Sequence, residues 1–196
     1  MNILAIDTCG GLCSVALLRD DKVIADCADK ALNMQAECLF PLIQTTFTTA
    51  QVSYDDLDAI GITIGPGSFT GIRVGLAAAY AISCLTEISL IGISTLELMA
   101  HINRNKAEHL CATVAAGRGR FYCQIFTQGV AAGDIKLLEI HDLEHFAAGA
   151  KLVGDYVEAD AQINAIQLGY FISHKYSTLE ALSALDISYL PKPVYI

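Results

Sequence analysis

The 196-residue sequence has no tryptophan, only four prolines and few basic residues. Its 12 lysines and arginines stand against 21 aspartates and glutamates, which gives a formal net charge of −9. A surface that binds nucleic acid by itself usually carries a basic patch that displaces counterions from phosphates. No Lys/Arg cluster exists beyond the scattered Arg118 and Arg120. The composition therefore argues against RNA binding by this chain alone. If RNA is bound, we expect a partner protein to supply most of the contacts to it.

An export signal and a long hydrophobic run are also missing. Asp7 interrupts the apolar start, and the longest apolar run, from Val74 to Leu85, is shorter than the ~20 residues that cross a bilayer. The seven cysteines include no C-x-x-C pair and no Cys/His ligand spacing, so they are predicted to be free thiols, mostly buried, in a reducing compartment. We therefore expect a cytoplasmic protein without a membrane segment and without a metal of its own.

Hydrophobic residues make up 54% of the chain, enough for one core or for two small lobes that share one. Alternating apolar residues predict three antiparallel strands over residues 2–28, with a turn at Asp20-Asp21. The predicted elements that follow are a helix at 36–49, a strand at 58–65, a long helix at 69–85, a strand at 88–94 and a helix at 95–104. Ser94 and Glu97 have the spacing of a capping box for the last of these helices.

The polar stretch 101–109 is the best candidate boundary, which predicts an N-terminal lobe of residues 1–104 and a smaller lobe of residues 105–196. The second part shows strand patterns near 110–116, 120–127, 135–140 and 151–155, a helix at 144–148 and two helices between 161 and 185. Three strands, helix, strand, helix, strand and helix is the order of the ribonuclease-H-like lobe of actin, sugar kinases and Hsp70. We therefore predict an α/β, actin-like (ASKHA) fold of two such lobes, with the second lobe reduced.

The most distinctive segment is GPGSFTGIRVG, residues 65–75, which runs directly into an apolar helix. It looks like a phosphate loop, with Ser68 or Thr70 as N-cap and free N–H groups at a positive helix terminus, but it lacks a Walker lysine. Arg73 could reach a phosphate or form a surface ion pair. Asp7, at the end of the first strand, is either a turn former or a phosphate-facing carboxylate. Asp7, Ser68 and Arg73 are thus candidates for a position next to a nucleotide.

The same helix carries Gly71, Gly75 and Ala79 at i, i+4 and i+8, which form one stripe of small residues. Such a stripe allows close approach of a second helix, either from a partner protein or from elements of the same chain.

The segments MNILAIDTCGGLCSVAL, GPGSFTGIRVG, LIGISTLELMA and PKPVYI resemble the TsaB (YeaZ) family, the small bacterial partner of TsaD in making threonylcarbamoyladenosine on tRNA. The resemblance covers nearly the whole chain, densest over 1–100 and thin over 129–185. It implies a direct, helix-to-helix contact with TsaD, or with a second copy of the chain, and TsaE within the assembled complex. ATP and a metal are then expected on the partner proteins, and tRNA is bound only through the complex. The residues expected at the interface are Gly71, Gly75, Leu76, Ala79, Leu39 and Ile43.

Catalytic residues are not apparent. A kinase of this superfold needs a second carboxylate on the hairpin that opens the second lobe, but the sequence has Ala115 and Ala116 there. From Ala115 to Arg120 the sequence also departs from the pattern D-A-R-x-G-E-V-Y that related TsaB sequences usually carry. The H-x-x-x-H metal motif of TsaD-like enzymes is replaced by Gln35 and Leu39. His141 and His145 are four residues apart, a spacing more often due to solvated polar residues than to a metal site.

We therefore expect a non-catalytic activator of a TsaD-like enzyme. The alternative is a stand-alone, nucleotide-dependent enzyme of the actin-like ATPase or kinase class.

Overall fold

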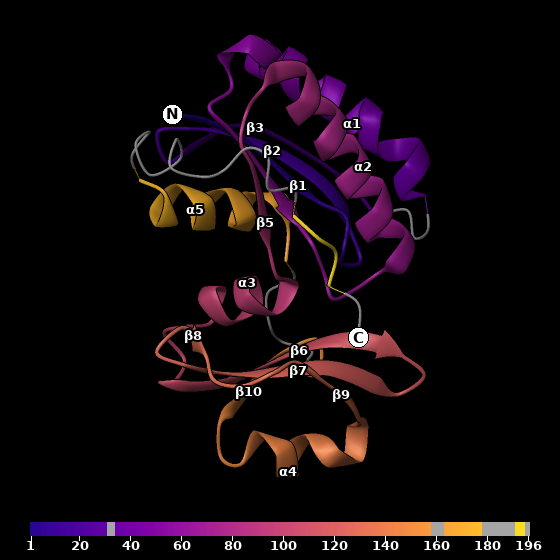
Figure 1. Ribbon diagram of the computed structural model, residues 1–196, viewed down its shortest axis with the longest axis vertical. Helices are drawn as coiled ribbons and strands as arrows, with labels where there is room; N and C mark the ends of the chain where they lie inside the picture. The colour runs from indigo at the N-terminus through magenta and orange to yellow at the C-terminus, as the bar shows by residue number, and fades with distance from the viewer. Residues whose placement is uncertain (31–33, 158–162, 178–190, 195–196) are drawn as a thin grey trace.

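Two β-sheets, one above the other in Figure 1, organise the chain. The computed structural model describes residues 1–30, 34–157, 163–177 and 191–194. The first sheet has the order β3-β2-β1-β4-β5, and its strands are β1 (Asn2–Asp7), β2 (Cys13–Arg19), β3 (Lys22–Asp29), β4 (Ala59–Thr63) and β5 (Leu90–Ile93). The first three strands are antiparallel, whereas β4 and β5 run parallel to β1. Asp20 and Asp21 form the β2–β3 turn with positive φ angles of 47° and 61°.

Helices α1 (Gln35–Ala50) and α2 (Phe69–Thr86) lie side by side on one face of this sheet (Figure 1). The apolar side chains that predicted α1 are buried against β2 and β3, namely Leu39, Leu42, Ile43 and Phe47. Pro41 lies in the second turn rather than the first, on the exposed side of the helix, where its missing N–H leaves no buried acceptor uncovered. A short 3₁₀ turn (Tyr54–Asp56) leads from α1 to β4.

The second sheet repeats the strand order of the first without its fifth strand. Strands β6 (His109–Gly117), β7 (Arg120–Thr127) and β9 (Lys136–Glu139) are antiparallel, and β10 (Lys151–Gly154) runs parallel to β6. Strand β8 (Val130–Ala131) adds a short pairing to β7, and a 3₁₀ turn (Ile140–Asp142) precedes helix α4 (Leu143–Ala147). The prediction of an α/β fold with two ribonuclease-H-like lobes, the second reduced, is confirmed.

The two remaining helices cross between the sheets. Helix α3 (Thr95–Ile102) follows the first sheet in sequence but packs on β6, and α5 (Ala165–Lys175) follows the second sheet but packs on β1 and β2. The last strand of the first sheet ends at Ile93 and the first strand of the second sheet begins at His109, so the predicted boundary falls between the two sheets. Helix α3, on the N-terminal side of that boundary, and α5, on the C-terminal side, each pack on the sheet of the other part. The second of the two helices predicted between residues 161 and 185 lies outside the described residues.

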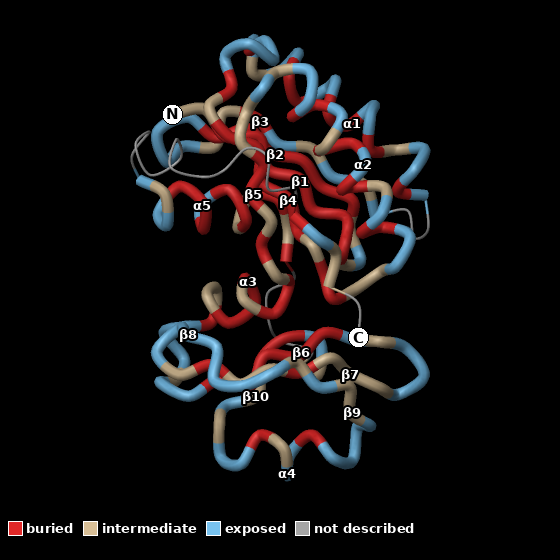
Figure 2. The backbone as a smooth tube through the Cα atoms, viewed as in Figure 1, coloured by how far each residue is buried: buried red, intermediate tan, exposed pale blue. Residues whose placement is uncertain are grey.

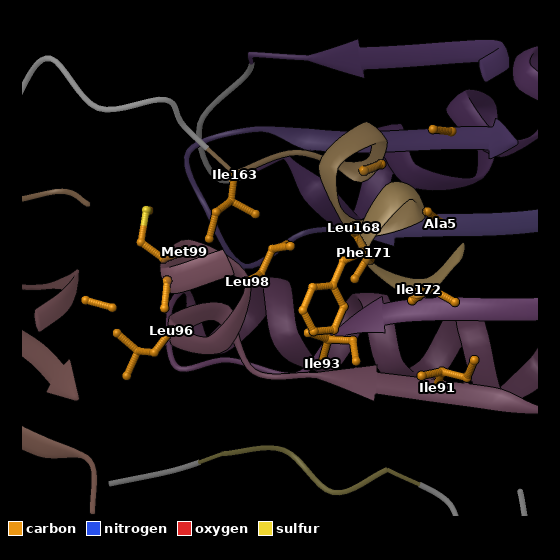
Figure 3. Packing of buried hydrophobic residues seen from close by; sticks show 14 of the residues in the cluster. Ala5, Ile91, Ile93, Leu96, Leu98, Met99, Ile163, Leu168, Phe171 and Ile172 are labelled. Atoms are coloured by element: carbon orange, nitrogen blue, oxygen red, sulfur yellow. The ribbon is translucent and has the colours of Figure 1, made fainter. Parts of the chain in front are cut away.

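A continuous hydrophobic core joins the two sheets because of this crossing. Figure 3 shows Leu168, Phe171 and Ile172 of α5 beside Ile93 of β5 and Leu98 of α3. A second core fills the space between the first sheet and α1 and α2, and a third, smaller one lies under α4. Figure 2 shows the buried residues concentrated in the strands of the first sheet, whereas the outer sides of α1, α2 and α4 are exposed.

Helix α2 is long and apolar enough, by length and composition alone, to cross a membrane. The apolar run from Val74 to Leu85 lies within this helix, which the sequence predicts at residues 69–85. Its buried positions include Ile72, Leu76 and Ile82, which pack in the core beneath α1 and α2. These contacts are those of a core helix.

Candidate functional site

The glycine segment packs directly on the turn between β1 and β2. The Ser68 N–H donates to the Cys9 carbonyl oxygen at 3.0 Å, and Thr8 Oγ1 donates to the Gly71 carbonyl oxygen at 2.7 Å. A Cβ atom on Gly67 would overlap the Cys9 carbonyl oxygen, and one on Gly71 would overlap the Thr8 carbonyl oxygen. Glycine is required at both positions because two stretches of backbone touch there.

Three N–H groups at this loop, those of Ser68, Gly71 and Ile72, are bonded within the protein. Ser68, rather than Thr70, is the N-cap of α2, because its side chain accepts from the Gly71 N–H at 3.1 Å. The Ser68 carbonyl oxygen accepts from the Ile72 N–H at 2.8 Å. The Ser68 N–H, which is donated to Cys9, and the Gly71 N–H, which is donated to the Ser68 side chain, are therefore not available to an anion. The geometry favours a packing role for this segment over phosphate binding.

The stripe of Gly71, Gly75 and Ala79 faces inward, so its prediction as a partner contact is wrong. A Cβ on Gly75 would overlap Thr8 Oγ1 and lie 3.0 Å from the Cδ1 atom of Ile62 in β4. The three other predicted interface residues, Leu76, Leu39 and Ile43, are also buried in the core beneath α1 and α2. The small residues let α2 approach its own sheet, which is the intramolecular alternative.

The surface that α1 and α2 do present, here called the outer helix face, is made by other residues. On α2 it comprises Phe69, Arg73, Ala77, Ala81 and Leu85, which recur at helical spacing and are all exposed. Phe69 and Leu85 are 54% and 85% exposed, and Phe40 of α1 is 57% exposed. The exposed stripe through Arg73, Ala77 and Ala81 also has small residues at i, i+4 spacing. Sequence reasoning chose the neighbouring stripe because both satisfy the same pattern.

The three residues predicted beside a nucleotide do not come together. Arg73 lies on the outer helix face, where its guanidinium stacks on the Phe69 ring 3.9 Å from the centroid. Ser68 is engaged as a helix cap. Asp7 is fully buried beneath the turn. No single ligand position is therefore indicated by this set.

Asp7 acts as a turn former inside the protein. Its Oδ1 accepts from Thr63 Oγ1 at 2.6 Å and from the Cys9 N–H at 3.2 Å, whereas Oδ2 has no hydrogen-bond partner among the described residues. Burial raises the pKa of Asp7 to about 6, and the two hydrogen bonds offset only part of that rise. Burial likewise raises the pKa of the neighbouring Cys9 thiol to about 12, with the Asp7 charge adding to the effect. The Cys9 thiol is thus not a nucleophile at neutral pH.

A carboxylate does lie at the hairpin that opens the second sheet, but it comes from a residue outside the hairpin. Asp155, which follows β10, accepts from the Ala115 N–H at 2.8 Å through Oδ2. The tip turns through Gly117, Arg118 and Gly119, all with positive φ. Asp155 was not found from the sequence because only the parallel pairing of β10 with β6 brings it to the hairpin. Its bond to a strand amide makes it a structural group.

Metal ligands are not gathered in the described residues: within 1–30, 34–157, 163–177 and 191–194, no group of three or more His, Cys, Asp or Glu side chains could hold an ion. His141 and His145 are both exposed, on the 3₁₀ turn and on α4 respectively. Gln35 and Leu39, at the spacing of the histidine motif, are buried on α1. The cysteines are free, and Cys9, Cys13, Cys111 and Cys123 are buried.

Comparison with known proteins identifies relatives by sequence and by structure. The family model described as tRNA N6-adenosine threonylcarbamoyltransferase, TsaD, matches residues 30–177. The tRNA threonylcarbamoyladenosine biosynthesis protein TsaB of Escherichia coli K12 is 37% identical over 124 residues, which are 62% of this chain and 53% of that protein. TsaB of Bacillus subtilis 168 is 30% identical over 126 residues, 64% of this chain and 55% of that protein.

The fold agrees with a solved structure of YeaZ from Pseudomonas aeruginosa, with a TM-score of 0.74 at 20% identity over 100% of this chain and 99% of that one. By sequence, the chain spans about half the length of the curated relatives it matches. The family model covers well over half of the chain, and these curated relatives are TsaB proteins. This chain therefore belongs to the TsaD family of tRNA threonylcarbamoyladenosine proteins, and within that family to the TsaB (YeaZ) group.

Proposed function

We propose that this protein is a non-catalytic partner and activator of a TsaD-like enzyme. The product of that enzyme is threonylcarbamoyladenosine on the adenosine next to the anticodon of tRNAs that read codons starting with A. The outer helix face is the observation that carries the proposal, because it presents exposed apolar side chains on two neighbouring helices. TsaE joins the assembled complex, tRNA binds only to that complex, and the cytoplasm is where the complex works.

The shape of the outer helix face suits a helix from another chain. Ala77 and Ala81 put only methyl groups on the exposed side of α2, and Phe40, Phe69 and Leu85 are exposed apolar side chains on α1 and α2. Ridges of one helix pack into the grooves of another, and exposed aromatic residues contribute disproportionately to protein interfaces. The same face would serve a homodimer when the partner is absent.

The interior of the protein supports a non-catalytic role. Asp7 is turned inward and bonded to Thr63 and Cys9, and Asp155 is bonded to the Ala115 amide. Phosphoryl transfer needs carboxylates that hold metal ions against the phosphates, and Asp7, which is fully buried, is not placed to do so. ATP and a metal therefore belong to the partner proteins in this proposal. Isothermal titration with ATP and Mg²⁺ tests the alternative, since tight binding by the isolated chain would indicate a stand-alone enzyme.

Substitution of Ala81 by arginine tests the interface directly. Ala81 is exposed, so Ala81→Arg should keep the melting temperature of the wild type, whereas a charged side chain in the middle of the seam should weaken binding to TsaD at least tenfold. Ala132→Arg, an exposed alanine beyond β8 on the other sheet, is the matched control and should bind TsaD normally. Equal binding by the two variants would show that TsaD contacts another surface.

The cellular role is tested by nucleoside mass spectrometry. Depletion of the protein should lower threonylcarbamoyladenosine in total tRNA, and re-expression of the wild type should restore it. The Ala81→Arg variant should fail to restore it, and the Ala132→Arg variant should succeed. Unchanged modification after depletion would refute the assignment to this pathway.

A further inference from the structure

Two cysteines from different elements meet where helix α1 packs on strand β2. Cys13 is the first residue of β2, and Cys38 lies in the first turn of α1. The Cys13 thiol donates a hydrogen bond to the Cys38 sulfur, and the Cys38 thiol donates to the Gln35 carbonyl oxygen at 3.9 Å. Cys13 belongs to the core beneath α1 and α2, and Cys38 packs against that core. The two sulfur atoms are therefore neighbours in the folded protein, as a disulfide requires.

The two thiols differ in their access to solvent. Cys13 is 2% exposed, whereas Cys38 is half-buried. Burial, followed by the contact with Cys38, raises the pKa of the Cys13 thiol well above its usual range, so Cys13 stays protonated at neutral pH. A small oxidant thus meets Cys38 first, and Cys13 is placed to react with the oxidised sulfur.

Two other cysteines lie nearby but are turned away or too distant. Cys9 donates its thiol proton to the Thr63 carbonyl oxygen at 3.2 Å, on the side of β4. Cys27 of β3 pairs with Val15, one step diagonally from Cys13. Diagonal neighbours on paired strands are about 7–8 Å apart, beyond the usual reach of a disulfide. Cys38 is therefore the partner that the packing gives to Cys13.

The charges around the pair select the class of oxidant. Asp7 and Asp29 place negative charge near Cys13, and the whole chain has a net charge of −9. Anionic disulfides such as oxidised glutathione are repelled by such a field, whereas a neutral hydroperoxide is not. Hydrogen peroxide is also small enough to reach a half-buried thiol.

We propose that Cys13 and Cys38 are an oxidisable pair that forms an intrachain disulfide on reaction with hydroperoxides. The Cys38 sulfur, as thiolate, attacks the peroxide: an S–O bond forms, the O–O bond breaks, and the proton released by Cys38 converts the leaving hydroxide to water. The Cys13 sulfur then attacks the Cys38 sulfenic acid, so that an S–S bond forms, the S–O bond breaks, and the hydroxyl group leaves with the Cys13 proton as a second water. Two thiols are oxidised and one peroxide is reduced.

The consequence of this bond is a covalent tie between the first turn of α1 and β2. Phe40, which belongs to the outer helix face, follows Cys38 by two residues on the same helix. The proposal concerns the bond alone and does not depend on the interaction with TsaD.

Peptide mapping of the purified full chain tests the bond. The protein is treated with hydrogen peroxide, its remaining thiols are blocked with N-ethylmaleimide, and it is digested with trypsin, which places Cys13 on residues 1–19 and Cys38 on residues 31–73. These two peptides should be linked in the fraction with the mass of a single chain, and dithiothreitol should separate them. Oxidation that leaves them separate, or that links either one to the Cys27 peptide, would overturn the proposal.

Three variants assign the two roles. Cys38→Ser should abolish the link. Cys13→Ser should abolish it too, but should leave Cys38 as a sulfenic acid that dimedone labels. Cys27→Ser, which removes another half-buried cysteine, is the matched control and should oxidise like the wild type. A linked peptide in Cys13→Ser would show that Cys9 is the partner, and dimedone labelling of Cys13 in Cys38→Ser to the same extent would refute the order of the two steps.

Thermal melting tests whether the bond holds the native packing. A disulfide that closes a loop of about 24 residues restricts the unfolded chain, so the oxidised wild type should melt at least about 4 °C above the reduced protein. Cys27→Ser should show the same rise, and Cys38→Ser should show none. Equal or lower melting of the oxidised wild type would mean that the bond does not fit the folded arrangement of α1 and β2, and would refute the site.

Discussion

Replacement of Gly71 by alanine should destabilise the protein without any partner being present. Gly71 lies in the first turn of α2, and a Cβ there would overlap the carbonyl oxygen of Thr8 and lie 3.0 Å from its carbonyl carbon. The obstructing atoms belong to the backbone. They are held by the Thr8 side chain, which donates to the Gly71 carbonyl oxygen, and by the Ser68 N–H, which donates to Cys9. Neither side of the contact can move without loss of a buried hydrogen bond.

The expected magnitude follows from two opposing effects. Extra volume in a packed contact typically costs 1–3 kcal/mol, and the upper end, about 3 kcal/mol, applies because backbone must shift. Alanine regains up to about 1 kcal/mol of helix propensity over glycine. The net loss in the free energy of unfolding is then about 2 kcal/mol, which corresponds to a fall in melting temperature of roughly 4–8 °C for a domain of this size.

Thermal melting of the purified variant measures this effect. Gly11→Ala is the matched control, because nothing lies within 4 Å of a Cβ at Gly11 and its backbone is not in the left-handed region. It should melt within about 2 °C of the wild type. A Gly71→Ala protein that melts at or above the wild-type temperature would refute the inward orientation of the stripe and restore it as a surface for partners.

Further predictions concern Gly75, protonation, thiol reactivity and RNA. Gly75→Leu should yield an unstable or aggregated protein rather than a folded one that has lost its partner, since the added side chain meets Thr8 and Ile62; a normal circular dichroism melt would contradict this. The pKa of Asp7 is raised from 3.8 to about 6, so from about pH 4 to pH 6 the folded state holds a proton that the unfolded chain releases, and stability falls as pH rises through this window. Compared with Asp7→Asn in urea unfolding, the wild type should lose about 2 kcal/mol between pH 4 and pH 7, and a constant difference would show that Asp7 is not buried. Cys84 is exposed and should react first with Ellman's reagent, whereas Cys9 should react only on unfolding; rapid labelling of Cys9 would contradict its burial. With a net charge of −9, the isolated chain should not shift tRNA in a gel at about 0.15 M salt, whereas its complex with TsaD should; a shift by the chain alone would mean that a basic surface exists.

The local structure of the first half of the chain was determined by the sequence. Alternation over residues 2–28 and the Asp20-Asp21 pair predict the three strands and their turn, because the period of two and the left-handed turn residues are local properties. The spacing of Leu39, Leu42, Ile43 and Phe47 predicts α1 for the same reason. The order of elements then suffices for the fold class, and the glycine segment suffices for the family.

Only the tertiary structure decided which face of each helix is free. Two stripes on α2, one through Gly71 and Gly75 and one through Ala77 and Ala81, satisfy the same spacing rule, and contact with Thr8 buries the first. The outcome depends on the register of α2 against the β1–β2 turn, a contact between residues about sixty positions apart. No local pattern encodes that register.

Contacts between distant side chains were hidden from the sequence for a similar reason. Ser94 and Glu97 predict a capping box, but the Glu97 carboxylate instead accepts from Lys175, which lies on a helix that returns across the molecule to the first sheet. Asp155 reaches Ala115 only through the parallel pairing of β10 with β6. Spacing along the chain determines which side chains share a helix face or a strand face, whereas the meeting of side chains from distant segments depends on how whole elements pack, because that packing minimises the exposed apolar surface of the entire molecule.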